Sequence, residues 1–124
     1  MTFAKTFIAG FTLLAAVANA AARLTSGPEL EESAATITII RWTTTNPGAT
    51  DLHFGIVHFG TEPDRLTQVA RSPNRRNQSH ADMTFRVRID GLRSHTTYYY
   101  TVESTDAMGR SDGVASSVGS FKTK

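Results

Sequence analysis

The chain has 124 residues, of which 40% are hydrophobic, 9% aromatic and 19% charged, a mixture typical of a single globular domain. Its formal net charge is only +2, which argues against a protein that binds nucleic acid through a basic face. The sequence contains no cysteine, which excludes disulfides, thiolate catalysis, zinc held by cysteine and a lipoprotein anchor.

The first 20 residues have the layout of a secretory signal peptide. Lys5 precedes an apolar run over residues 7–17, and Ala18-Asn19-Ala20 supplies the small residues of a cleavage site. The run is shorter than the roughly 20 apolar residues that a membrane-spanning helix needs. We therefore expect cleavage after Ala20, a mature domain over residues 21–124, and a secreted or periplasmic protein.

The rest of the chain reads as an all-β domain. Short runs of Val, Ile, Thr, Tyr and Phe alternate with clusters of Gly, Pro, Asn, Asp and Ser, as in a sandwich or barrel. In chain order we predict a weak strand within residues 23–32, then strands over 35–43, 52–59, 66–70, 83–90, 97–104 and 114–122. Turns over 46–48, 60–63, 90–91 and 109–113 separate them, because proline removes a ladder donor and glycine tolerates positive φ.

Alternation along these strands predicts which side chains form the core, since every second residue of a strand faces the same side. The predicted inward residues are Ile40, Trp42, Val57, Phe59, Phe85, Val87, Ile89, Tyr98, Tyr100 and Val102. Arg86 and Arg88 face solvent. Thr38 shares the inward face while Ile37 and Ile39 point the other way, which a bulge or a covered outer face would explain.

Several of these residues carry a family resemblance. Trp42, the segment Val57-His-Phe-Gly-Thr61 and the run Gly91-Leu92-x-x-x-Thr96-x-Tyr98-x-Tyr100-x-Val102 resemble a fibronectin type III domain over nearly all of residues 24–123. The third-strand end and the run Thr96-Thr-Tyr-Tyr-Tyr100 are similar to bacterial modules related to the N-terminal β-domain of purple acid phosphatases.

The resemblance implies an immunoglobulin-like, fibronectin type III β-sandwich of about seven antiparallel strands. It also implies a tyrosine corner, in which the Tyr98 hydroxyl bonds to backbone a few residues upstream. Ser94 and His95 occupy the turn where the family often has Pro-Gly.

Two motifs suggest catalysis, and their context argues against it. Residues 109–113 match Gly-x-Ser-x-Gly, but the nucleophile elbow that would activate Ser111 needs a strand followed by a helix. Asp51-x-His53 resembles the first metal motif of metallophosphoesterases, but the remaining ligand motifs are missing from the sequence. We predict a hairpin turn at 109–113, a polar loop at Asp51 and His53, and no catalytic residue, metal site or cofactor.

The predicted binding residues lie in two places. Phe54, Ile56 and His58 point outward from the third predicted strand, and Tyr99 lies on the adjoining strand of the same sheet. Large apolar side chains on a solvent face are typical of docking surfaces, although loops, a terminus or a second copy would also cover them. The second place is a predicted surface loop with a charge cluster, which suits an acidic partner, at Arg71, Arg75 and Arg76.

These observations predict an exported, non-catalytic binding or spacer module whose partner is a protein or a surface glycan. They predict that the protein does not bind nucleic acid, and that it does not bind a membrane once the signal peptide is removed. They leave the oligomeric state open. Two alternatives remain: an accessory domain of a purple acid phosphatase-like metallophosphoesterase that lacks its catalytic domain, and a carbohydrate-binding module.

Overall fold

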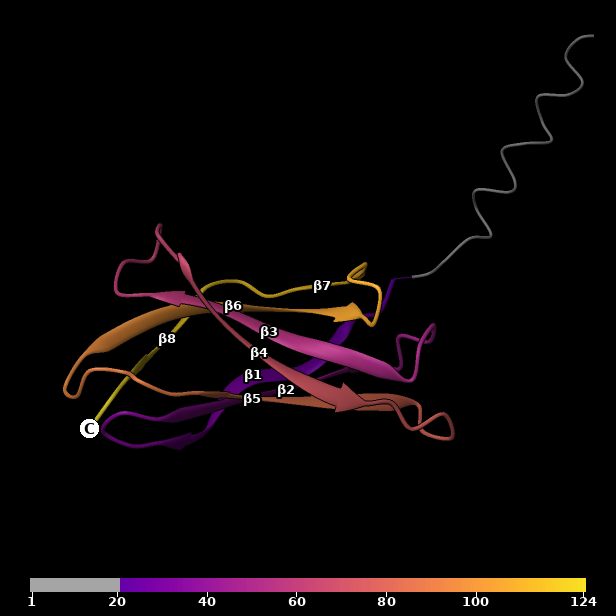
Figure 1. The fold of residues 1–124 in the computed structure, drawn as a ribbon, viewed down its shortest axis with the longest axis horizontal. Coiled ribbons are helices and arrows are strands. Elements are labelled where there is room, and N and C mark those ends of the chain that lie inside the picture. The colour runs from indigo at the N-terminus through magenta and orange to yellow at the C-terminus, as the bar shows by residue number, and fades with distance from the viewer. Residues whose placement is uncertain (1–20) are drawn as a thin grey trace, which may run out of the picture.

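The computed structural model describes residues 21–124, so the predicted signal peptide lies outside the described residues. This part of the chain forms eight strands: β1 (Leu24–Ser33), β2 (Thr38–Thr45), β3 (Leu52–Gly60), β4 (Gln68–Arg75), β5 (Asp82–Ile89), β6 (Thr97–Asp106), β7 (Ser111–Ala115) and β8 (Gly119–Lys122). Figure 1 shows them running lengthwise through an elongated molecule. Residues 21–124 hold no helix long and apolar enough to span a membrane.

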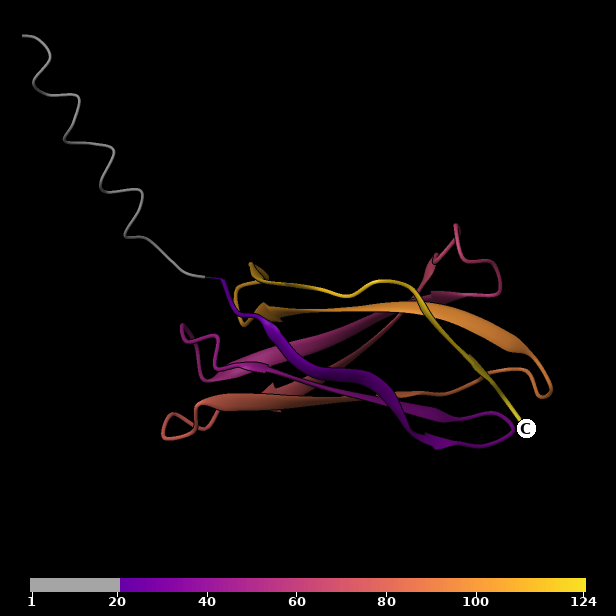
Figure 2. The same cartoon turned by 180° about the vertical axis from the view of Figure 1, so that it is seen from behind.

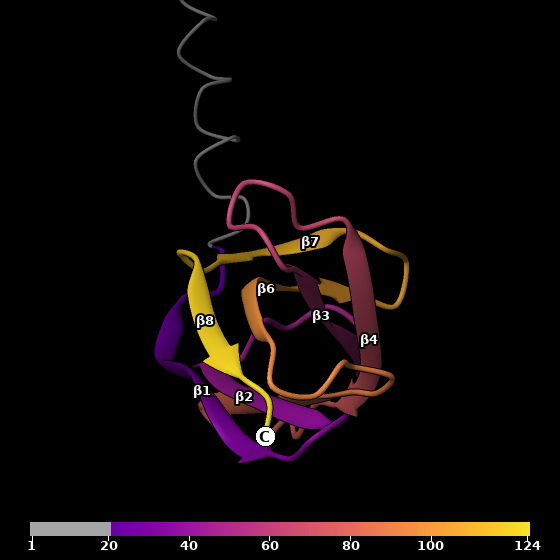
Figure 3. The ribbon, with the colours of Figure 1, turned by 90° about the vertical axis from the view of Figure 1, so that its left-hand side faces the viewer.

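The strands form two antiparallel sheets packed face to face (Figure 3). One sheet has the order β1-β2-β5, and the other has the order β4-β3-β6-β7, with β8 also paired to β6. This is the β-sandwich that the sequence predicts. Seen from behind (Figure 2), the chain beyond residue 21 passes beside β7, where the N–H of Ala22 donates to the carbonyl of Asp112 over 3.0 Å.

The last of the predicted strands is wrong in its extent. The predicted strand over 114–122 is divided into β7 and β8, and β7 begins inside the predicted turn, at Ser111. The division has a local cause: the Ser116 hydroxyl, rather than a backbone carbonyl, accepts the N–H of Val102 over 2.9 Å. A side chain thus takes one position in the ladder, and the second pairing begins only at Gly119.

The predicted loop over residues 71–76 is also wrong, because β4 continues through this segment to Arg75. Pro73 lies inside the strand, opposite Phe54 of β3. Proline is compatible with an edge strand when its nitrogen points away from the neighbour, and β4 is the edge of its sheet. The arginines and Pro73 favour a loop when the sequence is taken alone, but pairing with β3 makes this segment a strand.

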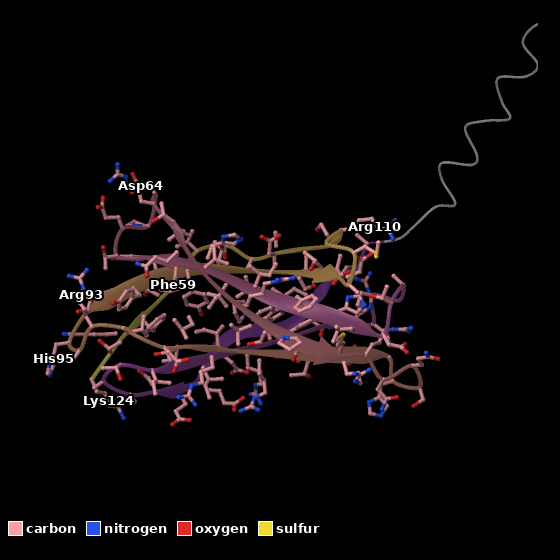
Figure 4. The ribbon with its side chains drawn as sticks, in the orientation of Figure 1. Phe59, Asp64, Arg93, His95, Arg110 and Lys124 are labelled. Carbon is pink, nitrogen blue, oxygen red and sulfur yellow. The ribbon has the colours of Figure 1, made fainter. Side chains whose placement is uncertain are left out.

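The core lies between the two sheets and contains every residue predicted to face inward. Trp42 is 1% exposed and stacks on Phe85, with ring centroids 5.4 Å apart. Phe121 of β8 joins them by stacking on Tyr98 at 5.5 Å. Figure 4 shows Phe59 between the layers.

Thr38 is fully buried, as its parity predicts. β2 pairs with β5 without interruption from Thr38 to Thr45, so this pairing contains no bulge. The register shifts fall in the β1–β2 pairing. Ile39 is half-buried on the opposite side of β2. The solvent side of β2 is therefore partly covered where Thr38 points inward.

The tyrosine corner is present. The Tyr98 hydroxyl accepts a hydrogen bond from the N–H of Arg93 over 2.9 Å. The turn that carries Ser94 and His95 is fixed from the C-terminus, because the Thr123 hydroxyl donates to the Arg93 carbonyl over 2.6 Å. His95 itself takes a left-handed conformation, with φ of 50°.

Candidate binding surfaces

The outward side chains of β3, β4 and β6 form one continuous surface, which we call the outer face. Its members, by alternation along each strand, are Phe54, Ile56, His58, Val69, Arg71, Pro73, Arg75, Tyr99, Thr101 and Glu103. The β3 and β6 members are half-buried and the β4 members are exposed. The structure therefore brings six of the seven predicted binding residues onto one sheet.

Cross-strand pairing sets the chemistry of the outer face. Ile56 lies between Arg71 of β4 and Glu103 of β6. The guanidinium of Arg71 lies 4.0 Å from the centre of the Phe54 ring, in a cation–π contact. His58 Nε2 lies 2.5 Å from a carboxylate oxygen of Glu103. An aliphatic centre is thus bordered by one cationic and one acidic edge.

The aromatic residues of the outer face are not adjacent. Tyr99 lies opposite Gly60, whereas Phe54 lies opposite Thr105, six residues further along β6. At a rise of about 3.4 Å per residue the two rings are about 20 Å apart. They do not make one stacking platform.

The three arginines of the predicted cluster have different surroundings. Arg71 and Arg75 are exposed on β4 and have no ion-pair partner among residues 21–124. Arg76 follows the strand and folds back, because its guanidinium donates to the Thr50 carbonyl at 3.2 Å and to Asp51 at 3.3 Å. Arg76 thus anchors a loop, while the other two carry free positive charge.

The opposite sheet carries ion pairs between its own side chains. Arg41 pairs with Glu29 at 2.8 Å, and Arg86 pairs with Glu31. The hydrogen bond from Arg86 lowers the pKa of the Glu31 carboxyl. Asp82 of β5 lies on the same face and has no ion-pair partner among residues 21–124.

A buried polar network lies beneath the end of the sandwich where β3 begins. His53 is fully buried; its Nδ1 lies 2.9 Å from an Asp112 carboxylate oxygen and its Nε2 lies 2.9 Å from the Gly48 carbonyl. The Ser104 hydroxyl donates to the same carboxylate oxygen over 2.8 Å. The network connects the β2–β3 loop, the two central strands and β7.

This network corrects one prediction and adds residues that the motif search missed. His53 lies in the core on β3, so its placement in a polar loop is wrong, although Asp51 does lie in the loop. His53 and His58 face opposite sides, as their spacing predicts. Alternation along β6 could have placed Ser104, which also contacts Asp112, on the inward side, because it has the same parity as inward-facing Val102.

The turn between β6 and β7 is organised by the buried carboxyl group of Asp106. It accepts the N–H groups of Arg110 at 3.0 Å and Met108 at 2.8 Å, and these bonds lower the pKa of the Asp106 carboxyl. Ser111 follows at the start of β7, and its hydroxyl accepts the N–H of Gly113 over 3.0 Å. The Gly-x-Ser-x-Gly motif therefore joins two strands, without the strand-to-helix turn of a nucleophile elbow.

An open hollow of about 650 Å³ lies beside this turn and is lined by Ala21, Asp106, Arg110 and Asp112, among others. Figure 4 shows Arg110 at this end of the molecule. Both carboxylates already accept hydrogen bonds from within the chain. Within the described residues, no group of three His, Asp or Glu side chains is arranged to hold a metal ion.

Solved structures share this fold. The fibronectin type III domain of human fibronectin type III domain containing protein 3 has a TM-score of 0.52 at 19% identity, over 86% of this chain and 88% of that one. The sensor domain of the anti-sigma factor RsgI4 of Pseudobacteroides cellulosolvens, in its long form, has a TM-score of 0.51 at 19% identity, over 82% and 86%. These likenesses establish a fibronectin type III-like fold.

Sequence comparison identifies the family. No curated protein matches the chain. The model of the family described as "Purple acid Phosphatase, N-terminal domain" matches residues 29–123, which is most of the chain. The match agrees with the tyrosine corner and with the arrangement of the two sheets. The chain therefore belongs to the purple acid phosphatase N-terminal domain family.

Proposed function

We propose that this protein is an exported, non-catalytic module that binds a protein partner through its outer face. The observation that carries the proposal is the position of half-buried Phe54 and Ile56 beside Arg71, which is exposed and has no ion-pair partner among residues 21–124. Aromatic residues and arginine are enriched where proteins dock.

The geometry favours a protein over a glycan as partner. A sugar-binding sheet uses exposed aromatic rings as platforms, but Arg71 covers one side of the Phe54 ring. Tyr99 lies too far along β6 to share a short sugar chain with Phe54. The mixed aliphatic and charged outer face resembles a protein interface more closely.

The test is recovery of partners from the native secreted fraction. Phe54→Ser and Tyr99→Ser should each lower recovery of a specific partner by about tenfold, the effect of losing one well-packed contact. Thr84→Ser, on the opposite sheet, is the control, and near-ultraviolet circular dichroism verifies that each variant is folded. Unchanged recovery and unchanged self-association in both outer-face variants would rule out this surface.

A second candidate function rests on the family match over residues 29–123. The chain would serve as an accessory domain that acts with a separately encoded metallophosphoesterase. Mixing it with such an enzyme from the same organism should change p-nitrophenyl phosphate hydrolysis or produce a stable complex. An unchanged rate together with no complex on size-exclusion chromatography would contradict this role.

A further inference from the structure

The free edge of β4 offers hydrogen-bonding groups as well as charge. β4 lies at the end of the order β4-β3-β6-β7, so within residues 21–124 only one of its sides is paired with another strand. An unpaired edge presents a row of N–H and C=O groups that an additional strand can bind.

The ladder shows which groups point outward. Val102 exchanges hydrogen bonds with Ser116, so its backbone groups face away from β3. Its partner Val57 must therefore bond to Ala70 of β4, because a strand residue directs its N–H and C=O to one neighbour only. The next residues of β4, Val69 and Arg71, direct theirs to the free edge.

Two further observations agree that alternate residues of β4, beginning at Val69, direct their backbone groups to the free edge. Pro73 has no N–H and falls at an edge-facing position, where no ladder bond is lost. The N–H of Arg76, which has the parity of Ala70, donates toward the β3 side, to the Asp51 carbonyl, over 2.7 Å. Val69, Arg71 and Arg75 therefore offer free N–H groups along the edge, with a gap at Pro73.

The side chains at the same positions specify charge. Arg71 and Arg75 are exposed and have no ion-pair partner among residues 21–124. Contact with the Phe54 ring holds the Arg71 guanidinium against the sheet. A strand added about 4.8 Å from β4 would place its own outward side chains directly beside these two arginines.

We propose that the free edge of β4 binds an extended acidic segment of a partner protein as an added strand. This inference rests on the proposed function and specifies its partner class. Since Arg71 and Arg75 are four residues apart, the segment carries acidic residues at positions i and i+4, with an apolar residue opposite Pro73 between them. A second copy of this chain lacks this pattern, because no two of its eleven acidic residues are four positions apart.

The probe is the peptide Thr-Thr-Glu-Thr-Val-Thr-Glu-Thr-Thr, titrated into isotope-labelled protein expressed from its full sequence. Binding should slow amide exchange at Val69, Arg71 and Arg75 by about tenfold or more, as expected of N–H groups that enter a ladder. The same peptide with lysine in place of glutamate should not bind. Charge reversal with Arg71→Glu and Arg75→Glu together should weaken binding by about tenfold, while Arg93→Glu, which is remote and exposed, should not.

A matched pair of variants separates strand addition from simple charge attraction. Val69→Pro removes one edge N–H without breaking the β3–β4 ladder and should weaken peptide binding by about tenfold, whereas Val69→Ala should leave it unchanged. Equal binding by these two variants, binding of the lysine peptide, or no binding at all would overturn the inference. The proposed function fails separately, through unchanged partner recovery by Phe54→Ser and Tyr99→Ser.

Discussion

Two buried polar side chains, Tyr98 and His53, have different structural roles in the sandwich. Tyr98 holds the turn before its own strand through one hydrogen bond to Arg93. His53 links a loop carbonyl to a carboxylate on another strand and is itself fully buried. One fixes a connection between the sheets, and the other stabilises the end of the molecule that carries the β6–β7 turn.

Removing the Tyr98 hydroxyl should destabilise the protein modestly. Tyr98→Phe deletes a hydrogen bond in the core and should lower the free energy of unfolding by about 1 kcal/mol. Tyr99→Phe is the matched control, because within residues 21–124 the Tyr99 hydroxyl has no hydrogen-bond partner. Urea denaturation of both variants measures the difference, and equal stability would show that the corner contributes nothing.

Removing the Asp112 carboxylate should destabilise the protein more than removing the Tyr98 hydroxyl does. Asp112→Ala leaves His53 Nδ1 and the Ser104 hydroxyl buried without the carboxylate that both contact, and should lower the free energy of unfolding by about 3 kcal/mol. Asp82→Ala removes an exposed carboxylate that has no ion pair in the described chain, and should change stability by less than about 0.5 kcal/mol. Thermal unfolding of the two variants tests this, and a small loss for Asp112→Ala would contradict the role of the network.

The strands differ in how well the sequence predicts them. β5 ends at Ile89, directly before the predicted turn at Asp90, because alternation and turn chemistry agree there. At β4 they disagree: Pro73 and the arginines favour a loop, and only pairing with β3 makes a strand. The proposed binding residues on β3 and β6 follow from alternation alone. Which backbone groups of β4 face the edge depends instead on its pairing register with β3, and no local sequence pattern contains that register.

The β6–β7 turn should respond to acid through Asp106. The N–H groups of Arg110 and Met108 lower the pKa of this carboxyl in the folded state. Its stabilising effect is therefore complete above the ordinary carboxyl pKa and is lost as pH falls through the lowered value. The Met108 and Arg110 amide resonances should shift over that acidic range, and Asp106→Asn should abolish the transition. A shift that persists in the variant would assign it to another group.

The two positive-φ glycines of this region differ in what surrounds them. Gly109 and Gly113 have φ of 86° and 88°, so alanine is strained at either site, by about 1 kcal/mol. A methyl group on Gly113 would also collide with the Cβ of Ala21, whereas nothing lies within 4 Å at Gly109. Gly113→Ala should therefore be less stable than Gly109→Ala by about 1 kcal/mol. Equal melting temperatures would show that Ala21 does not pack on β7.

At the scale of the whole molecule, the two outer surfaces of the sandwich are unlike. In the β1-β2-β5 sheet, Arg41 and Arg86 pair with acidic residues of the same sheet. Within residues 21–124, the outer face of the other sheet combines half-buried apolar groups with arginines that have no ion-pair partner, and it ends in an unpaired strand edge. Family membership accounts for the architecture of the chain. The difference between the two surfaces supports the proposal that a partner binds at the outer face.

The most direct test of a one-sided binding module is site-specific photo-cross-linking. A benzoylphenylalanine group replaces Ile56 at the centre of the outer face in one protein and Thr84 on the opposite sheet in another, and each is irradiated in the native secreted fraction. A discrete cross-linked species from position 56 and none from position 84 is the predicted result. The same species from both positions, or from position 84 alone, would contradict the account.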